Sequence, residues 1–135
     1  MPITNREIIQ AVFDASAEQD WETVKSLVHD DIQVYEADSL PYAGVFKGPE
    51  QFVALIQEVF STWEDVDHTI KHIVADGEFV VILANMAGRA KTTGRTFSVP
   101  MAEVWRFRDG KVSEIRPHYF DTKALHDAHY GSADS

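Results

Sequence analysis

The sequence contains no cysteine and is poor in basic side chains. Without cysteine the chain forms no disulfide, carries no thiolate nucleophile and offers no sulfur ligands for zinc or iron–sulfur sites. Its 12 basic and 22 acidic residues give a formal charge of −10. Because contacts to phosphate need clustered Lys and Arg, this charge argues against nucleic acids and anionic membranes as partners.

Long apolar runs and the motifs of common cofactors are missing as well. No apolar run approaches the ~20 residues of a membrane-spanning helix, and the first residues lack the apolar core of a signal peptide. There is no glycine-rich phosphate loop, G-x-S-x-G elbow, H-E-x-x-H motif or dinucleotide fingerprint. We therefore expect a soluble, cytoplasmic protein that uses no organic cofactor and no metal.

The residues that are present suffice for one folded domain. The chain has 135 residues, of which 44% are hydrophobic, including 8 Phe, 3 Trp and 4 Tyr. We expect a single domain over residues 1–130 and a frayed tail over 131–135. Residues 1–67 hold 14 of the acidic and 3 of the basic side chains, which we interpret as solvated faces of surface helices.

Helical signals dominate the first half of the chain. Thr4 and Glu7 form a capping-box pattern before a helix that runs to about Gln19, and Asp20 can cap a second short helix. Pro49 opens the clearest helix. Its apolar residues recur at helical spacing and form one stripe that faces a core, namely Phe52, Leu55, Ile56, Val59, Phe60 and Trp63.

Strand signals dominate the second half, where the apolar period changes to two. A short first strand is expected at 32–35, followed by a loop over 36–47. Later strands are expected at 69–75, 79–87, 97–107 and 111–120. Asp121 can cap a last helix that runs to about His129. This order predicts an α+β fold with helices packed on one face of a curved antiparallel sheet.

Glu103 is the most informative single residue. It lies between Met101 and Trp105 on an alternating strand, so all three side chains share one face. If that face is the core, burial raises the pKa of this carboxyl unless a partner stabilises its charge. A neutral acid there could donate to a substrate oxyanion or act as a general acid. The alternative is a salt bridge to Arg106, Arg116 or another strand neighbour.

His118 and Glu36 are the other candidate catalytic residues. His118 is near the end of the last strand, where it could share a face with Glu103 and form an acid–base pair, or simply be packed and hydrogen-bonded. Glu36 continues the alternation of Ile32 and Val34, so it could point inward at the mouth of a pocket. Otherwise it is a solvated loop carboxylate.

Weaker candidates surround these three. Asp38 is either a turn residue or part of the site, and several side chains could line an apolar cavity or be core. The expected lining is Tyr35, Asp38, Tyr42, Phe46, Trp63, Trp105 and Phe120. His68 and His72 are four residues apart on a strand, too far along it to share a metal directly. His126 and His129 belong to an exposed helix face rather than to a metal site.

Together, several strings resemble the nuclear transport factor 2-like superfamily, in its ketosteroid isomerase-like and SnoaL-like (polyketide cyclase) branch. They are Asp20-Trp21-Glu22, Gly44-x-x-x-Gly48, Ala75-Asp76-Gly77, Glu103-Val104-Trp105-Arg106-Phe107, Asp109-Gly110-Lys111-Val112 and Tyr119-Phe120-Asp121-Thr122. The resemblance covers nearly the whole chain. It implies a cone-shaped curved sheet wrapped around the helices, a deep apolar pocket between them, and homodimers formed through the outer sheet face.

The resemblance also assigns roles to residues. Glu36 stands where ketosteroid isomerases carry their base aspartate, and Glu103 matches the buried acid of their oxyanion hole. Val12 stands where their oxyanion-hole tyrosine is expected, so that donor is missing. Limonene epoxide hydrolases carry an aspartate at the position of His118, but their other triad residues fall near Ala84 and Met86, which cannot replace them.

The leading hypothesis is a cofactor-independent acid–base enzyme, of isomerase or cyclase type, that acts on a small apolar cyclic carbonyl compound. Glu36 or His118 would remove a proton next to the carbonyl, and a neutral Glu103 would stabilise the enolate. One alternative is a non-catalytic module of the same fold that binds a small molecule or dimerises. Another is a dehydratase or epoxide hydrolase, for which Asp38 and His118 are the candidate pair.

Overall fold

The computed structural model describes residues 4–131 and confirms the α+β fold. The expected frayed tail lies outside the described residues, except for Gly131. The helices are α1 (Asn5–Ala17), α2 (Trp21–Leu27), α3 (Gly48–Thr62) and α4 (Thr122–Tyr130). The strands are β1 (Val28–Glu36), β2 (Gly44–Lys47), β3 (Trp63–Asp76), β4 (Phe79–Ala90), β5 (Thr96–Arg108) and β6 (Lys111–Tyr119).

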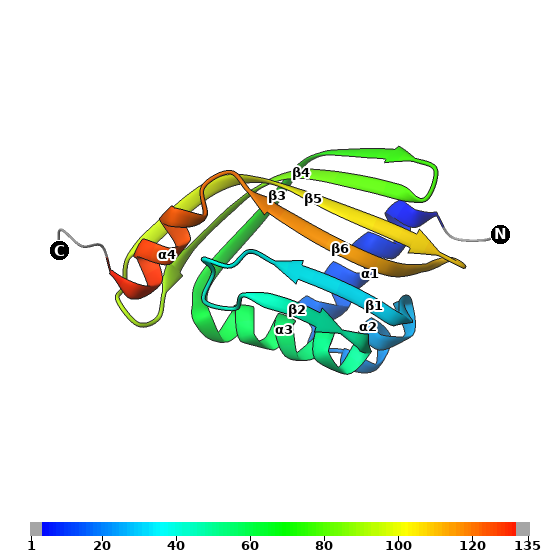
Figure 1. Ribbon diagram of the computed structural model, residues 1–135, viewed down its shortest axis with the longest axis horizontal. Helices are drawn as coiled ribbons and strands as arrows, with labels where there is room; N and C mark the ends of the chain where they lie inside the picture. Colours follow the sequence, from blue (N-terminus) through cyan, green and yellow to red (C-terminus); the bar gives the residue numbers. More distant parts are fainter. Residues whose placement is uncertain (1–3, 132–135) are drawn as a thin grey trace.

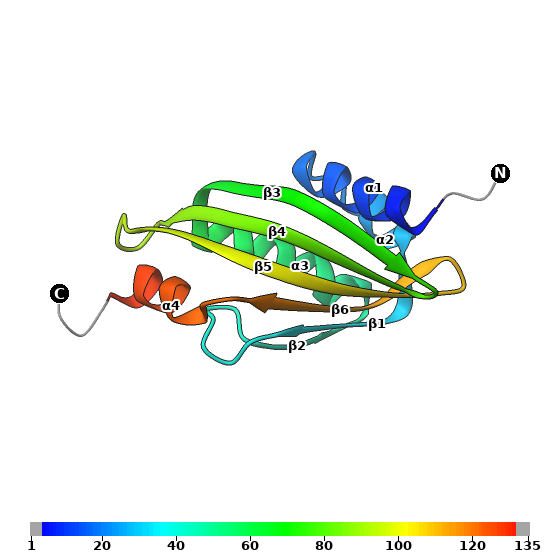
Figure 2. The same cartoon turned by 90° about the horizontal axis from the view of Figure 1, so that it is seen from above.

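The strands form one curved, six-stranded sheet in the order β2-β1-β6-β5-β4-β3 (Figure 2). The β1–β6 pair is parallel and the other neighbouring pairs are antiparallel. The consecutive pairs β3–β4, β4–β5 and β5–β6 build the long meander that the alternation predicted. The strand β1, which follows α2, pairs with β6. Strands from the first and the last part of the chain therefore lie side by side within the sheet.

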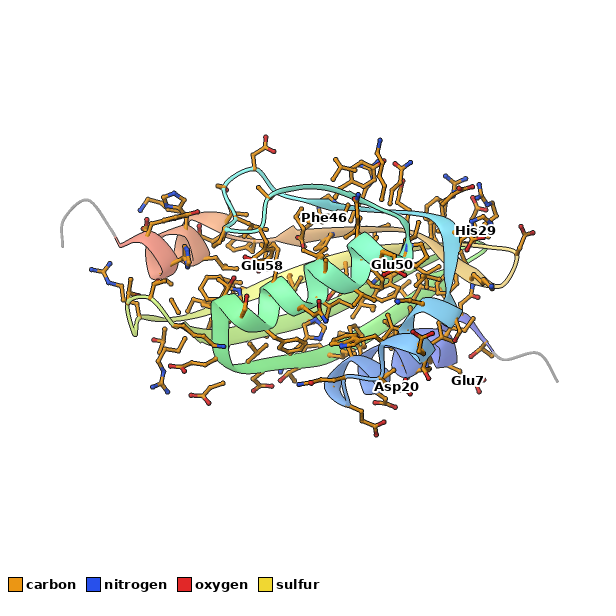
Figure 3. All side chains as sticks on the ribbon, turned by 90° about the horizontal axis from the view of Figure 1, so that it is seen from below. Glu7, Asp20, His29, Phe46, Glu50 and Glu58 are labelled. Carbon is orange, nitrogen blue, oxygen red and sulfur yellow. The ribbon has the colours of Figure 1, made fainter. Side chains whose placement is uncertain are left out.

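The helices α1 and α3 cover one face of this sheet, which we call the inner face, and α4 lies at the end near the β4–β5 turn (Figures 1 and 3). The core between them includes the fully buried Ile9, Val12, Ile32, Trp63 and Trp105. In Figure 3 the helices carry acidic side chains on their solvent side; Glu7, Asp20, Glu50 and Glu58 are all exposed. The solvated-helix interpretation therefore holds for these residues, whereas other acidic residues of the first half lie in β1, β3 and the loop between β1 and β2.

The expected helix caps are present. The Thr4 hydroxyl accepts from the Glu7 amide at 3.1 Å, and the Glu7 carboxylate accepts in return from the Thr4 amide at 3.2 Å. Asp20 accepts from the Thr23 amide at the start of α2. Asp121 accepts from the first amides of α4. These bonds satisfy backbone N–H groups that a helix start leaves without partners.

The segment 36–47 is not wholly a loop, as the sequence had suggested. Its last four residues form β2, which pairs with β1 in a register that sets Val34 opposite Phe46. Four residues are too few to show the alternation of apolar and polar side chains that predicts a strand. The segment is recognised as a strand only by its pairing with β1. The strands β1 and β3 also begin earlier than expected, directly at the ends of the preceding helices.

A bulge in β3 changes which side chains face inward. Ile70 pairs with Ala84 and His72 pairs with Leu83, so Lys71 is an extra residue. Before the bulge His68 faces the inner side; after it His72 is exposed. No helix within residues 4–131 is long and apolar enough to cross a membrane.

Candidate active site

An apolar cavity of about 200 Å³ lies between the inner face of the sheet and the helices α1 and α3. Its helical wall includes Val12, Phe13 and Ser16 of α1 with Phe52, Leu55, Ile56, Val59 and Phe60 of α3. Its sheet wall includes Val34, Glu36, Val66, His68, Met86, Met101, Glu103, Trp105, Ile115, Pro117 and Tyr119. Three ionisable side chains besides Tyr119 therefore meet in otherwise apolar surroundings.

Glu36 is the last residue of β1 and points into this cavity. Its side chain follows Ile32 and Val34 on the inward face, as the alternation predicted, and is only 9% exposed. Its Oε1 atom is buried and has no hydrogen-bond partner. Burial, with a further contribution from the charge of Glu103, raises the pKa of this carboxyl to about 8. At neutral pH Glu36 therefore keeps its proton.

Glu103 has the opposite environment, because both of its oxygens are hydrogen-bonded. The indole N–H of Trp105 donates to Oε1 at 3.1 Å, and Nε2 of His68 is 2.6 Å from Oε2. Since an indole nitrogen can only donate, Glu103 acts as an acceptor there. The expectation of a free, neutral Glu103 that donates to an oxyanion is therefore not supported. The expected alternative partners, Arg106 and Arg116, pair with Glu78 and Glu114 instead. The partner of Glu103 is His68 of β3, a strand that is not adjacent to β5 in the sheet.

His68 completes a histidine–carboxylate pair on the cavity wall. Burial by itself lowers the pKa of its imidazole, but the hydrogen bond and charge of Glu103, with Asp67, outweigh it and raise the pKa above its ordinary value. The ring of Phe13 lies 5.2 Å from the imidazole, measured between ring centroids. His68 is therefore an imidazole on the cavity wall that is held in place by Glu103 and Phe13.

Two tyrosines extend the polar part of the site. The hydroxyls of Tyr119 and Tyr42 are 3.3 Å apart, and the indole N–H of Trp63 donates to Tyr42 at 3.0 Å. Burial, the neighbouring Tyr42 and the charge of Glu36 raise the pKa of Tyr119 well above its ordinary value. Burial, with Glu36, raises that of Tyr42 to about 12. Both hydroxyls remain neutral and can donate hydrogen bonds.

The cavity thus contains one unpaired acid, one histidine–carboxylate pair and one tyrosine hydroxyl. Such a set can transfer protons to and from a neutral ligand without a cofactor. Within residues 4–131 no three His, Asp or Glu side chains lie close enough together to hold a metal ion.

His118 does not belong to this site, contrary to expectation. The register pairs Glu103 with Pro117 and Ala102 with His118. Because opposite residues of an antiparallel pair point to the same side, Pro117 and Tyr119 face the cavity, and the exposed His118 faces outward. The prediction missed the register by one residue, which is enough to change the face.

Of the seven side chains expected to line the cavity, only Trp105 does so. Tyr35 lies on the outer face, with the Arg116 guanidinium 3.8 Å from its ring centroid. Asp38 is an exposed loop residue, and Phe120, just after β6, is 84% exposed. Phe46 and Trp63 pack in the core outside the cavity lining, and Tyr42 lies one hydrogen bond behind Tyr119.

His68 and Tyr119 are the site residues that sequence reasoning missed. The spacing of His68 and His72 directs attention to metal binding, but His68 also alternates with Val66 and Ile70 on an apolar face. Tyr119 alternates with Ile115 in the same way. A polar residue in an apolar row was the signal available in both cases, the same signal that identified Glu36 and Glu103.

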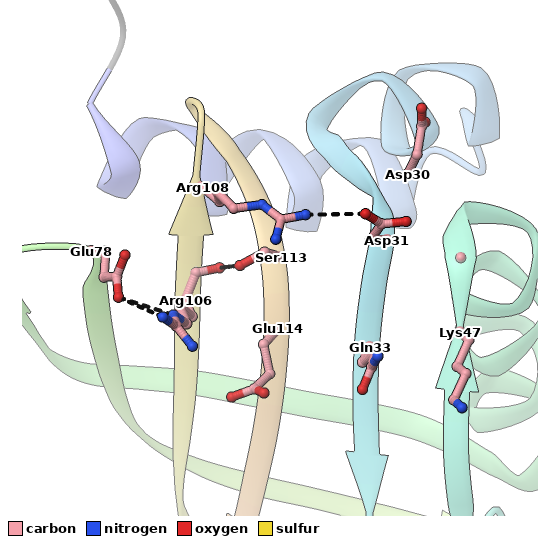
Figure 4. A pocket seen from close by; sticks show the side chains of 10 residues that line it. Asp30, Asp31, Gln33, Lys47, Glu78, Arg106, Arg108, Ser113 and Glu114 are labelled. Carbon is pink, nitrogen blue, oxygen red and sulfur yellow. Dashed lines mark hydrogen bonds and ion pairs between the residues drawn. The ribbon is translucent and has the colours of Figure 1, made fainter.

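A second, larger hollow of about 650 Å³ lies on the opposite, outer face of the sheet (Figure 4). Its charged side chains are largely matched: Arg106 pairs with Glu78 at 2.9 Å, and Arg108 with Asp31 at 3.2 Å. None of the residues around it is buried. Although it has more volume than the apolar cavity, it holds no unpaired buried group, so we assign the candidate active site to the inner cavity.

Several solved structures have the same arrangement of helices and curved sheet as this protein. A nuclear transport factor 2-like protein from Burkholderia xenovorans shares 30% identity over 92% of this chain and 94% of its own, with a TM-score of 0.82. A protein from Catenulispora acidiphila with a ketosteroid isomerase-like fold, in complex with trimethylamine, shares 23% identity over 98% of both chains, with a TM-score of 0.78.

A protein from Jannaschia sp. CCS1, described as a SnoaL-like polyketide cyclase, shares 18% identity over 95% of this chain and 92% of its own, with a TM-score of 0.81. These proteins define the class as nuclear transport factor 2-like. The SnoaL-like domain family matches residues 9–115, so the chain belongs to that family. No curated protein matches its sequence.

Proposed function

We propose that the protein is a cofactor-independent acid–base enzyme that enolises a small cyclic carbonyl compound. The observation that carries this proposal is the buried, unpartnered Oε1 of Glu36 in the same cavity as the His68–Glu103 pair. Unpartnered buried polar atoms are costly, and a ligand oxygen in the cavity would supply the missing partner. The membership of the SnoaL-like family and the ketosteroid isomerase-like fold of a structural neighbour are consistent with this reading.

In the proposed reaction Glu36 and His68 take complementary roles. Protonated Glu36 donates a hydrogen bond to the carbonyl oxygen and stabilises the enolate that forms. Neutral His68, oriented by Glu103, accepts the proton from the carbon next to the carbonyl and returns it to the same or another carbon. The proton returns to the substrate, so the enzyme ends each cycle in its starting state.

The size and lining of the cavity support a small substrate. Pockets for drug-sized ligands measure roughly 300–1,000 Å³, whereas this cavity measures about 200 Å³. Its walls are mainly Val, Leu, Ile, Met and aromatic side chains. A ligand of one or two rings with a single carbonyl group fits these limits, whereas a four-ring steroid is too large.

Hydrogen exchange tests the proposal directly. We expect the protein to accelerate the incorporation of deuterium next to the carbonyl of 1-tetralone in D₂O, followed by mass spectrometry. Glu36→Gln and His68→Gln should each slow this exchange by ~10²-fold or more, since general acid–base groups contribute about that much. The exposed His118→Gln provides the matched control and should exchange at the wild-type rate.

The same experiment separates the alternatives. Binding of 1-tetralone without accelerated exchange would favour a small-molecule-binding module. Loss of exchange in His118→Gln would show that His118 is needed for catalysis, although its side chain faces away from the cavity. A dehydratase or epoxide hydrolase based on Asp38 and His118 has no support, because both side chains are exposed and outside the cavity lining.

A further inference from the structure

A third hollow, of about 550 Å³, adjoins the active-site cavity. Ser16 and Phe60 line both spaces, so these two side chains stand at the junction between them. The remaining residues that line the third hollow are Ala17, Gln19, Trp21, Gln57 and Ser61. We call it the vestibule. It lies where α1 and α2 meet the carboxyl-terminal half of α3 (Figure 3).

The chemistry of the vestibule differs from that of the cavity. No ionisable side chain lines it, and its polar groups are two amides and two hydroxyls beside an indole ring. The side chains of Gln19 and Gln57 are exposed and make no hydrogen bond within residues 4–131, so both amides are accessible to a ligand. An amide group provides two donors and an acceptor, which suits hydroxyl groups, and an indole face packs against the apolar side of a ring.

Charge around the vestibule disfavours anions. The helices α1 and α3 both end here and have no basic residue in the last turn, so the negative ends of their dipoles are uncompensated. Glu18 and Asp20, the exposed neighbours of Gln19 in the chain, add negative charge. A carboxylate or phosphate on the ligand would therefore be repelled, and an uncharged group would not.

We infer that the vestibule is a second subsite, which binds an uncharged, hydroxyl-bearing substituent of the substrate, of the size of one hexosyl unit. The inference rests on the proposed function, since the ring that carries the carbonyl group occupies the inner cavity. Phe60, which is 44% exposed, separates the two subsites and packs between the two parts of the bound molecule. The natural substrate is then an elongated molecule with an apolar head and a neutral, hydroxylated tail.

Three matched ligands test this inference: 6-hydroxy-1-tetralone, its 6-O-β-glucoside and its 6-O-β-glucuronide. Their dissociation constants are measured by titration calorimetry with the full-length protein. We expect the glucoside to bind at least tenfold more tightly than the aglycone. The glucuronide has the same ring but carries a carboxylate, so it should bind no more tightly than the aglycone.

Variants test whether the vestibule glutamines cause the tighter binding of the glucoside. In the double variant Gln19→Ala/Gln57→Ala the glucoside should bind within about twofold of the aglycone, whose own affinity stays unchanged. Gln10→Ala, an exposed glutamine of α1 that is not part of the vestibule, is the control and should leave all three affinities unchanged. An equal loss for glucoside and aglycone in the double variant would show a merely structural effect and overturn the inference.

The outcomes also distinguish this inference from the proposed function. A glucoside that binds no better than the aglycone to the wild type, a glucuronide that matches the glucoside, or no binding of any of the three would overturn the inference. If the glucoside binds more tightly than the aglycone, and this preference is lost in Gln19→Ala/Gln57→Ala, the subsite is upheld. If the protein in the same case does not accelerate deuterium exchange, the proposed enzymatic function is contradicted.

Discussion

Two glutamates in one cavity show how surroundings decide what a side chain can do. Glu103 accepts hydrogen bonds on both oxygens, whereas Oε1 of Glu36 is buried without a partner. The two residues have the same chemistry in water, but only Glu36 is left with a buried group to offer a ligand. In the proposed reaction Glu103 is therefore a positioning residue, and Glu36 and His68 are catalytic residues.

The raised pKa of Glu36 makes the stability of the protein depend on pH. Its value is 4.5 in an unperturbed chain and about 8 in the folded protein. Between these values the folded chain keeps a proton that the unfolded chain releases, so the free energy of unfolding falls as the pH rises from about 4.5 to 8. Glu36→Gln removes this loss and should stabilise the protein at pH 8 by on the order of 4 kcal/mol.

Urea denaturation of the wild type and Glu36→Gln between pH 4 and pH 8.5 measures this effect. The difference between the two free energies should be small near pH 4 and largest near pH 8. Because the contribution of His68 is present in both proteins, it cancels in this difference. Curves that run parallel over the whole range would contradict the assignment of a buried, protonated Glu36.

The pKa of His68 provides a separate test of the His68–Glu103 pair. Glu103→Gln keeps an acceptor for Trp105 but removes the negative charge next to the imidazole. Burial and the charge of Asp67 remain, so the pKa of His68 should fall below its value in the wild-type protein. NMR titration of the imidazole resonances measures this shift. A pKa of His68 that is the same in both proteins would contradict the pair.

At the scale of elements, register and bulges determine which side chains meet. Glu36 reaches the cavity because β1 continues to its last residue with an unbroken alternation. His68 faces inward on one side of the β3 bulge and His72 faces outward on the other. A shift of one residue in β6 exchanges His118 for its neighbours Pro117 and Tyr119. Each of these outcomes depends on pairing between strands that are distant in the sequence.

Helix caps should make measurable contributions to stability. Asp121 accepts hydrogen bonds from two amides at the start of α4, a helix that is anchored by the fully buried Leu125. Asp121→Ala should lower the free energy of unfolding by about 1 kcal/mol, which is typical for the loss of an N-cap. Asp38→Ala, an exposed loop variant without such bonds, should change it by less than ~0.5 kcal/mol. Equal effects of the two in urea denaturation would contradict the capping role.

At the scale of the whole molecule, the outer sheet face carries apolar side chains that no helix covers. Phe79 and Leu83 of β4 and Val74 of β3 are exposed there, and Val81 is half-buried between them. Exposed apolar groups that lie together on a sheet are typical of interfaces. We expect a homodimer through this face, as the resemblance implied, since a second copy would bury these side chains without altering the inner cavity.

Light scattering after size exclusion measures the oligomeric state. The wild type should elute with the mass of a dimer, and Leu83→Asp should weaken the dimer by at least tenfold, because a charge would be buried without a partner. Tyr130→Asp, which places the same charge on the exposed surface of α4, should remain dimeric. A monomeric wild type at micromolar concentration would refute the expectation.

The sequence by itself determined the helix caps, the fold class and the order of the helices and long strands, and it singled out Glu36 and Glu103 as carboxyls that could face inward. These features are local, because capping bonds and apolar periodicity depend on residues a few positions apart. The four-residue strand β2, the bulge at Lys71 and the outward position of His118 were missed. They depend on which residues pair across strands, a choice made by packing rather than by any single segment.

The tertiary structure alone decided the chemistry of the site. Three acidic or basic side chains from β1, β3 and β5 meet in a space whose walls come from both halves of the chain. Only this arrangement places His68 and Trp105 against the two oxygens of Glu103 and leaves Oε1 of Glu36 without a hydrogen-bond partner. It also makes His68, rather than His118, the histidine that contacts Glu103. The absence of cysteine excluded sulfur chemistry at the outset, but the proton chemistry arises from the burial of a few carboxyls among apolar side chains, which folding alone brings about.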